Sequence, residues 1–446
     1  MNDKHKISAQ NQESAISTRM SRRKMLAATT GAIGAGVLGR FNILRAQDAN
    51  TGLLRIGLVG AGGRGAGAAD QALSVSGGDV KLTAVADVFE DRLKGAVIGL
   101  SKKHGEKANV PANRQFVGFD GYQQVLQHCD FIILATPPGF RPFHFAAAVA
   151  AGKNVFMEKP TCVDAFGARL CMETAKLADS KGLKVVVGLQ RHYQASYRET
   201  LKRVQDGMIG DIVTANVYWN GSGIWYRKRK PGMNEMQFQM NNWYHFCWLC
   251  GDHIVEQHVH NLDVANWFIG ALPESAYGFG GRQARNPTEP SEIYDHHTVE
   301  YRYPKGIIVN SQCRQFGGGD QRVTEEFRGT KGIAKPGEIR DYKGNIVWKH
   351  DGKNDPNPYQ VEHDELHAAI RSNKPINNAH YGATSSFTAV LGRYATYTGK
   401  EWKWDSALKL NHRTMPEKLD WDTPPPTLPD KDGNYELPLP GKYKLA

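Results

Sequence analysis

The sequence predicts an α/β protein with a doubly wound parallel sheet, followed by a second α/β domain with a large, mostly antiparallel open sheet. Between residues 53 and 191 short β-rich runs alternate with helical stretches, a pattern typical of a parallel sheet with helices on both faces. Beyond this point the β-rich runs become longer and more aromatic, which favours an antiparallel sheet with one exposed face. The length of 446 residues accommodates two domains of ordinary size.

The individual elements follow from these patterns. We predict strands at 56–59, 82–86, 131–135, 154–156 and 185–189 in the first half, and at 213–219, 277–280, 297–303 and 307–313 in the second. Helices are predicted at 362–372 and 385–398, packing back on the domains, and consecutive prolines at 424–426 indicate an extended tail. The predicted organisation is a first domain over 53–191, a second over 192–404 and an extended C-terminal arm over 405–446.

The first 46 residues are predicted to be a twin-arginine export signal. A polar, basic lead, the pair Arg22-Arg23, an apolar Gly/Ala-rich stretch and a closing Arg45-Ala46 occur in that order. The apolar stretch is too short for a membrane span, which needs about 20 residues, and Arg40 interrupts it. We therefore expect a periplasmic or otherwise exported protein with no stable membrane span after signal cleavage; an uncleaved, tethered form is the alternative.

Charge and cysteine content exclude two further classes. The formal net charge is +11, but the first 46 residues hold eight Lys/Arg against two Asp/Glu, which leaves +5 for the rest. That balance gives no reason to expect a nucleic-acid partner. The six cysteines are too few and too irregularly spaced for a disulfide framework. For Cys247 and Cys250, the single CxxC, we expect a packed aromatic helix, with a local disulfide as the alternative.

A glycine-rich turn follows the first predicted strand. Gly60, Gly62 and Gly65 form a GxGxxG motif between a hydrophobic run and a helix of small residues, which is the context of a Rossmann dinucleotide-binding turn. The first glycine permits the tight turn, the second lets the pyrophosphate approach the backbone, and the third allows close helix packing. The predicted cofactor-binding turn comprises Gly60, Gly62, Gly63, Arg64 and Gly65.

The residue at the end of the next predicted strand indicates which dinucleotide is bound. Asp87 follows the last motif glycine at the spacing of a ribose-binding carboxylate. It would accept hydrogen bonds from the adenosine ribose hydroxyls and would repel a 2′-phosphate. We therefore predict NAD as the cofactor. NADP is the alternative, because Arg64 or Arg92 lies close enough in sequence to bind a 2′-phosphate.

Two further runs carry a family resemblance. Residues 135–138 (ATPP) and 151–160 (AGKNVFMEKP), with His144 between them, resemble the Gfo/Idh/MocA oxidoreductases, the family of glucose-fructose oxidoreductase and myo-inositol dehydrogenase. The resemblance spans about 53–398, and Glu-Lys-Pro after a Gly-Lys-x-Val strand is its most specific part. It implies hydride transfer between NAD(P) and a CH–OH group, and a homo-oligomer formed through the open sheet of the second domain. The cofactor contacts it implies are Thr136, Pro137, His144, Glu158 and Lys159.

The resemblance also implies catalytic residues. It places Lys159 near the nicotinamide, before a cis proline. Oxidation of an alcohol independently requires a group that contacts the hydroxyl, and a lysine beside a cationic nicotinamide has its charged form disfavoured. The family's acid and histidine, one helical turn apart, match Glu256 and His260, with His260 as the general base and Glu256 orienting it. Two departures, Glu for the usual Asp and His258 for the usual glycine, should reshape the pocket.

The residues of this region bear on two kinds of ligand, a metal ion and a carbohydrate. Glu256, His258 and His260, with His253, are possible metal ligands, but helical residues two apart do not share a face, so we predict no metal. The aromatic residues between the first strand of the second domain and the catalytic helix, Trp243 among them, can stack on sugar rings, so we predict a small carbohydrate substrate. The remaining predicted contacts are Arg191, His192 and His258 for the substrate and Gln190 for the nicotinamide.

Three functions fit these residues. In the first, an exported oxidoreductase keeps NAD tightly bound, because a freely exchanging cofactor would be lost outside the cytoplasm, and a second sugar or another acceptor reoxidises it. In the second, the same NAD oxidises a sugar transiently so that a glycosidic bond is eliminated, water adds and the hydride returns, which is a redox-neutral glycoside hydrolase. The third is a non-catalytic sugar-binding protein, against which Lys159, Glu256 and His260 together argue.

Overall fold

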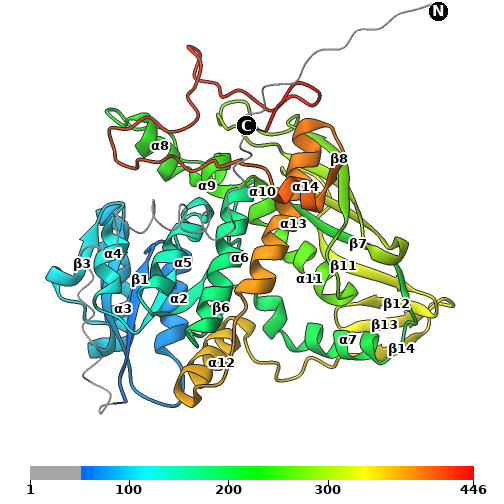
Figure 1. Cartoon of the computed structure of the whole chain (residues 1–446), viewed down its shortest axis with the longest axis horizontal. Helices are drawn as coiled ribbons and strands as arrows, with labels where there is room; N and C mark the ends of the chain where they lie inside the picture. Colours follow the sequence, from blue (N-terminus) through cyan, green and yellow to red (C-terminus); the bar gives the residue numbers. More distant parts are fainter. Residues whose placement is uncertain (1–51, 446) are drawn as a thin grey trace, which may run out of the picture. The chain divides into compact units, whose positions relative to one another are not determined.

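The computed structural model describes residues 52–445, and its first sheet is parallel (Figure 1). Its strands are β1 Leu54–Val59, β2 Val80–Asp87, β3 Gln115–Val117, β4 Phe131–Leu134, β5 Asn154–Met157 and β6 Val185–Val187. They run in the order β3-β2-β1-β4-β5-β6, and every neighbouring pair is parallel. This is the strand order of a Rossmann sheet. The predicted doubly wound sheet is confirmed, and β3, a half-buried three-residue strand with no hydrophobic run, was missed.

Helices cover both faces of this sheet. They are α2 Gly63–Leu73, α3 Glu90–His104, α4 Gly121–Leu126, α5 Arg141–Ala150 and α6 Ala165–Ser180. One apolar core joins the sheet to α2 and α3, and another joins it to α4, α5 and α6. All four residues of β4 are buried, as expected for a strand covered on both faces.

The second sheet has nine strands and is mostly antiparallel. These are β7 Ile212–Gly221, β8 Ser275–Gly281, β9 His296–Arg302, β10 Ile308–Gln315, β11 Arg322–Gly329, β12 Gly332–Lys335, β13 Glu338–Asp341, β14 Ile346–Lys349 and β15 Trp402–Lys403. Their order is β14-β13-β12-β11-β7-β10-β9-β8-β15, and only β7 and β10 pair in parallel. The predicted open sheet is confirmed. The strands from β11 to β14 were missed because charged side chains on the exposed face interrupt their apolar pattern.

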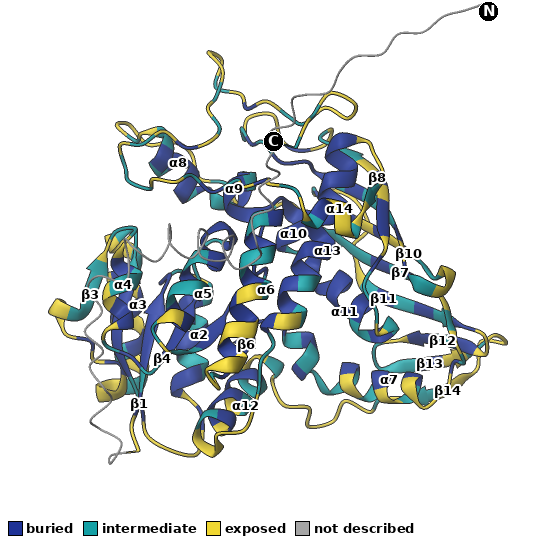
Figure 2. Ribbon diagram, viewed as in Figure 1, coloured by how far each residue is buried: buried dark blue, intermediate teal, exposed yellow. Residues whose placement is uncertain are grey.

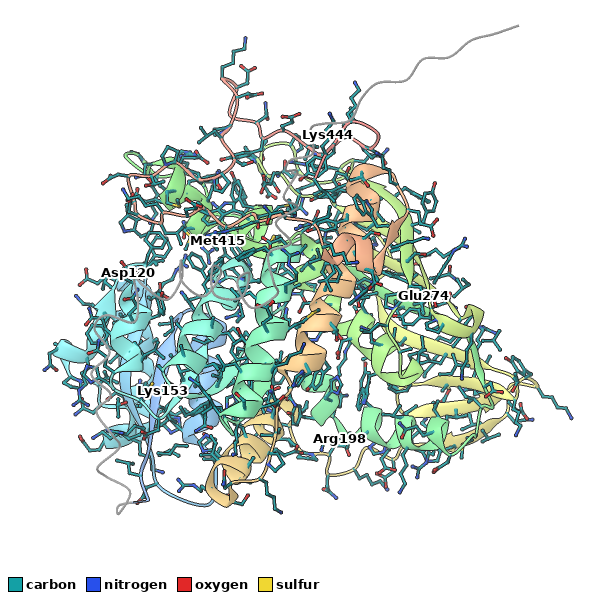
Figure 3. The ribbon with its side chains drawn as sticks, in the orientation of Figure 1. Asp120, Lys153, Arg198, Glu274, Met415 and Lys444 are labelled. Carbon is teal, nitrogen blue, oxygen red and sulfur yellow. The ribbon has the colours of Figure 1, made fainter. Side chains whose placement is uncertain are left out.

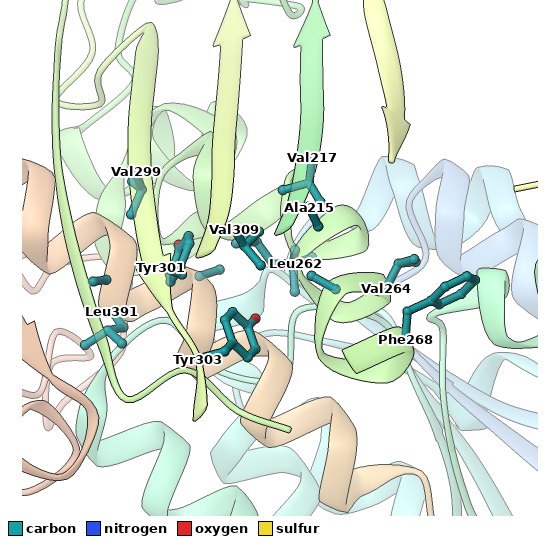
Figure 4. Packing of buried hydrophobic residues seen from close by; sticks show 14 of the residues in the cluster. Ala215, Val217, Leu262, Val264, Phe268, Val299, Tyr301, Tyr303, Val309 and Leu391 are labelled. Carbon is teal, nitrogen blue, oxygen red and sulfur yellow. The ribbon is translucent and has the colours of Figure 1, made fainter. Parts of the chain in front are cut away.

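One face of the second sheet packs on helices. They are α7 Ala195–Gln205, α10 His253–Glu256, α11 Val259–Ile269 and α13 Ala379–Thr398. Helix α12 Pro358–Ser372 instead packs on α2 and the first sheet, through residues such as Leu366. Alternate residues of β9, Val299 and Tyr301, point toward Leu262 of α11 and Leu391 of α13 (Figure 4). Figure 2 shows α13 buried along nearly all its length. The predicted helix over 362–372 is confirmed, and that over 385–398 begins earlier, at Ala379.

Two irregular segments lie beyond these layers. Residues 222–250 connect β7 to α10 and contain α8 Glu235–Asn241 and α9 Cys247–Cys250. The thiols of Cys247 and Cys250 are free, and Trp248 between them is buried, as predicted for a packed aromatic helix. After α14 Trp404–Leu408, the described part of the tail forms neither helix nor strand, yet Met415 and Tyr435 are buried.

Two predictions concern the membrane and the export signal. No helix within residues 52–445 is both long enough and apolar enough to cross a membrane. The predicted twin-arginine signal, residues 1–46, lies outside the described residues.

Candidate active site

A pocket lies at the carboxyl ends of the parallel strands. It lies where β1 meets β4 and the strand order reverses, which is where such sheets bind ligands. Nine predicted cofactor residues line it: Gly60, Gly62, Gly63, Arg64, Gly65, Asp87, Thr136, Pro137 and His144.

The glycines of the turn have different surroundings. Gly60 has φ +89°, and a Cβ there would lie 2.6 Å from the backbone of Ala135. A Cβ on Gly65 would lie 1.8 Å from the carbonyl oxygen of Gly60, so both positions require glycine for the fold itself. Added Cβ atoms on Gly62 and Gly63 would meet no protein atom within 4 Å, although both line the pocket. The space beside them fits a pyrophosphate close to the backbone.

We expect Gly62→Val to weaken NAD binding on the order of tenfold or more, with the free energy of unfolding nearly unchanged, because the side chain fills the pocket and not the protein core. The matched control is Gly95→Ala on the exposed face of α3, which should leave NAD affinity unaltered. Titration with NADH fluorescence and thermal unfolding measure the two effects. Undiminished NAD affinity in Gly62→Val would contradict this placement of the pyrophosphate.

Two backbone N–H groups hold the Asp87 carboxylate in place. Its Oδ2 accepts a hydrogen bond from the N–H of Ala61 (2.7 Å) and its Oδ1 one from Phe89 (2.9 Å). Burial raises the pKa of this carboxyl, an effect that the two backbone donors oppose. Each oxygen keeps a further acceptor site, so the carboxylate fits a ribose diol.

The two arginines considered for NADP have protein partners. Arg64 pairs with Glu158 (2.6 Å) and Glu362 (3.5 Å). Arg92 donates to Asn241 Oδ1 (2.6 Å), and its guanidinium lies 4.3 Å from the centre of the Phe89 ring. The charge of Arg64 is thus paired with carboxylates, whereas Arg92 has neutral partners and lines the pocket.

Lys159 and Glu256 form a buried ion pair. Lys159 follows β5, and its peptide bond to Pro160 is cis, as the resemblance implies. The Lys159 ammonium donates to Glu256 Oε1 (2.9 Å) and to the backbone oxygen of the same residue (2.6 Å). The two side chains are 11% and 8% exposed. The structure therefore brings two of the three predicted catalytic residues into direct contact.

The predicted continuous helix carrying Glu256 and His260 is wrong. Helix α10 ends at Glu256, α11 begins at Val259, and Gln257 and His258 lie between them. The N–H of His258 bonds back to His253 across five residues (3.1 Å), and its Nε2 is hydrogen-bonded to Ser311 on β10 (2.7 Å). This anchor to the sheet interrupts the helix. Within the described part of the chain, Glu256 is hydrogen-bonded to Lys159 and not to His260.

His260 is a buried, neutral imidazole. The residue is 6% exposed, and its ring lies nearly parallel to that of Trp219, with 5.8 Å between their centres. Its Nδ1 has no hydrogen-bond partner among the described residues. Burial, and then the charges of Lys159 and Arg191, hold the pKa of His260 well below its usual 6.5. The ring is thus uncharged near neutral pH and can accept a proton.

Arg191, a predicted substrate contact, forms a buried ion pair. Its guanidinium donates to Glu325 on β11. Glu325 also accepts from the Tyr197 hydroxyl (3.0 Å) and from Asn261 Nδ2 (2.6 Å). Burial raises the pKa of this carboxyl, and Arg191 opposes that effect. The pair joins the end of the parallel sheet to the second sheet, close to His260.

The other predicted contacts have varied surroundings. His192 is hydrogen-bonded to Asp263 (2.8 Å) and stacks against Trp267 and Tyr381. His258 is fully buried and does not reach the pocket. Trp243 lines the cofactor pocket, and Gln190 has a buried Oε1 without a hydrogen-bond partner in the described part, which fits an amide of the cofactor. These roles stay predictions.

A cluster of possible metal ligands lies apart from the predicted one. Asp252, His253 and His297 are buried, and a ligand atom of each lies within 4.8 Å of the others. Asp252 already accepts hydrogen bonds from His253 Nδ1 (2.8 Å), the Tyr397 hydroxyl (2.5 Å) and the N–H of Tyr294 (3.0 Å). Burial opposes its ionisation, but His297 and His253 outweigh this and hold the pKa of Asp252 well below its usual value. We interpret the cluster as a polar anchor for α10; that no metal is bound stays a prediction.

Two family models match the chain. The model described as "Oxidoreductase family, NAD-binding Rossmann fold" matches residues 54–189, and the "GFO/IDH/MocA C-terminal domain" matches residues 197–335. An inositol 2-dehydrogenase of Rhizobium meliloti is 25% identical over 283 residues, which are 63% of this chain and 74% of the relative. An inositol 2-dehydrogenase of Cereibacter sphaeroides is 32% identical over 152 residues, 33% of this chain and 41% of the relative. The NAD-binding domain predicted from the glycine turn is confirmed.

Solved structures share the fold. An aldose-aldose oxidoreductase from Caulobacter crescentus has a TM-score of 0.62 and 17% identity, over 78% of this chain and 99% of that one. A scyllo-inositol dehydrogenase from Lactobacillus casei, solved with NAD(H) and scyllo-inositol, has a TM-score of 0.60 and 20% identity, over 79% of this chain and 100% of that one. At these identities the likeness concerns the arrangement of the two sheets and their helices.

Proposed function

The chain belongs to the Gfo/Idh/MocA family of NAD-binding oxidoreductases, and on this premise we propose that it oxidises a CH–OH group of a sugar, polyol or sugar derivative. One observation carries the proposal. Directly after β5, Lys159 pairs with Glu256, and the charge of Lys159 is felt by the buried His260; nine predicted NAD contacts, among them the glycine turn and Asp87, line one pocket. When bound, NAD supplies the hydride acceptor.

The residues of the chain handle the proton. His260 accepts the hydroxyl proton of the substrate through its Nδ1, which is buried and lacks a protein partner within residues 52–445. Burial and the charges of Lys159 and Arg191 lower the pKa of the imidazole, so it is uncharged before the reaction. Lys159 donates a hydrogen bond to the same oxygen as negative charge develops there. Glu256 holds the ammonium in position through its carboxylate and its backbone oxygen. The substrate thus loses a hydride from carbon and a proton from oxygen, and a carbonyl forms.

A ring-shaped polyol fits the surroundings of His260. Trp219 is half-buried at the end of β7, and its ring is available to stack on the apolar face of a sugar. The Arg191 guanidinium, paired with Glu325, lies 5.8 Å from the centre of that ring. Relatives of the chain are named for inositol, which is such a ring.

Export and assembly belong to the same proposal. Export through the twin-arginine route, suggested by Arg22-Arg23, would carry the protein folded with NAD already bound, so that the cofactor has to be recycled in place. A homo-oligomer would cover the open face of the second sheet. On that face Tyr277 and Phe279 of β8 are 53% and 66% exposed.

The test is a substrate screen with the purified full-length protein and NAD. We expect at least one inositol, aldose or glycoside to give reduced nicotinamide, and a simple alcohol such as 2-propanol to give none. Aglycone release without net reduction would indicate the redox-neutral glycoside hydrolase instead. If the protein binds NAD but no inositol, aldose or glycoside causes either NAD reduction or aglycone release, the proposed function is contradicted. That result would favour a non-catalytic sugar-binding protein.

A further inference from the structure

Two residues that line the NAD pocket come from outside the parallel-sheet half. Met240 belongs to α8 and Trp243 follows that helix, and both lie within segment 222–250. They border the same pocket as Asp87 and Phe119. Because Asp87 fits the adenosine ribose, this is the end of the pocket that the adenosine would occupy. Met240 and Trp243, from the second domain, therefore form part of the wall of the pocket at its adenosine end, which we call the adenosine wall.

A direct bond ties this wall to the parallel-sheet half. Arg92, which lines the pocket on α3, donates to Asn241, the last residue of α8 (2.6 Å). The wall also rests on the loop that follows β4: a Cβ on Gly139 would lie 2.1 Å from the Trp248 backbone oxygen. The approach is close enough that segment 222–250 cannot shift toward the pocket without moving that loop.

The C-terminal segment lies against the wall from outside (Figure 1). Gln239 on α8 donates to the backbone oxygen of Thr427 (2.7 Å), and Asn234 donates to that of Trp421 (2.7 Å). The centre of the Trp421 ring lies 4.8 Å from that of Phe119, which lines the pocket. It lies 5.5 Å from that of Phe89, two residues after Asp87. Trp421 thus contacts both the wall and the loops on which the adenosine would lie.

An apolar cluster makes these pieces one unit. It joins α8, α9, the loop after β4 and the C-terminal segment, and Figure 3 labels Met415, one of its members. The tail is fastened before it reaches the cluster, because Thr414 donates to Asp164 from both its N–H (2.7 Å) and its hydroxyl (2.8 Å). The buried members are Phe140, Met236, Phe238, Met240, Phe246, Trp248, Leu249, Met415 and Tyr435.

We propose that segments 233–250 and 414–435 form a cap over the adenosine half of the NAD pocket, and that this cap retains NAD on the protein between turnovers. Release of the dinucleotide then requires the cap to move, which breaks the Arg92–Asn241 hydrogen bond and separates Trp421 from Phe89 and Phe119. The inference rests on the proposed function only in taking NAD as the cofactor. It assigns Met240 and Trp243 as binding residues and Trp421 as the residue that positions them.

The test measures NAD release and not turnover. The full-length protein is loaded with NAD and passed through gel filtration, and the nucleotide that stays bound is quantified over time by chromatography. We expect the unsubstituted protein to retain NAD, and Trp421→Ala to release it on the order of tenfold faster, because two aromatic contacts are lost. Trp348→Ala on β14, in the other sheet, is the matched tryptophan control and should retain NAD.

A second variant distinguishes loss of the cap from a general folding defect in Trp421→Ala. Asn241→Ala removes only the bond to Arg92, and faster release with unchanged thermal unfolding supports the cap. Equal release rates in the unsubstituted protein and both cap variants would overturn it. The two proposals fail separately: NAD that is retained but never reduced contradicts the proposed function, whereas substrate oxidation with NAD exchanging equally fast in every variant contradicts the cap.

Discussion

His260→Ala is expected to lower kcat/KM for alcohol oxidation by about 10²–10⁴-fold, the usual contribution of a general base, with NAD affinity unchanged. The imidazole is buried beside Trp219, and its Nδ1 has no protein partner among residues 52–445, so its removal leaves the hydroxyl proton without an acceptor. Steady-state kinetics with the best substrate from the screen and NADH titration measure the two quantities. Added imidazole, which can enter the vacated space, is expected to restore part of the rate.

The pH dependence provides an independent check on His260. Burial, followed by Lys159 and Arg191, holds the pKa of the imidazole well below 6.5, so the base stays unprotonated as the pH falls to that value. Oxidation by the unsubstituted protein is therefore not expected to lose kcat/KM through this group until the pH is well below about 6.5. Two results would contradict the assignment of His260 as the base: a kcat/KM that rises only above pH 6.5 as a group loses its proton, or unaltered turnover in His260→Ala.

Lys159→Met is expected to abolish detectable oxidation and to lower the free energy of unfolding by about 3–5 kcal/mol. The side chain is nearly isosteric but uncharged, so the substrate oxygen loses its donor. The Glu256 carboxylate, 8% exposed, also loses the ammonium that neutralises it. Urea unfolding measures the change in stability, and single-turnover absorbance of the reduced nicotinamide measures the chemical step.

The double variant Lys159→Met/Glu256→Gln separates these two effects. Neutralising the carboxyl removes the unpaired buried charge, so much of the lost stability should return while oxidation stays absent. If the double variant were as unstable as Lys159→Met, the ion pair would not be the source of the instability. If Lys159→Met kept its activity, the role assigned to Lys159 would be wrong.

Much of the cofactor half could be predicted because its signals are local. A buried parallel strand such as Phe131–Leu134 is a continuous hydrophobic run, and the turn that binds the dinucleotide requires glycine at fixed spacing. Gly60 and Gly65 show why: a single Cβ at either position would collide with backbone atoms. The hydrophobic run and the spaced glycines can therefore be recognised from residues that are neighbours in the sequence.

The catalytic region was predicted less well because tertiary contacts override its local pattern. The family resemblance placed Glu256 and His260 one turn apart on a helix, but α10 ends at Glu256, α11 begins at Val259, and His258 between them is hydrogen-bonded to Ser311. Glu256 is paired with Lys159. Glu325, the partner of Arg191, lies on a strand whose alternating charges resemble a solvent-exposed segment, so no signal in the sequence marked it as buried.

The sequence by itself determined the Rossmann turn and the family and predicted Asp87 as the ribose-binding carboxylate, since each depends on residues close together in the chain. Only the tertiary structure decided which residues face each other across the site. Met240 and Trp421 lie far from Asp87 in sequence, and packing of the two sheets and the tail brings Met240 to the same pocket as Asp87 and Trp421 to the ring of Phe119, which lines it. Contacts between residues far apart in the sequence depend on how the whole chain folds, so a short sequence motif cannot predict them.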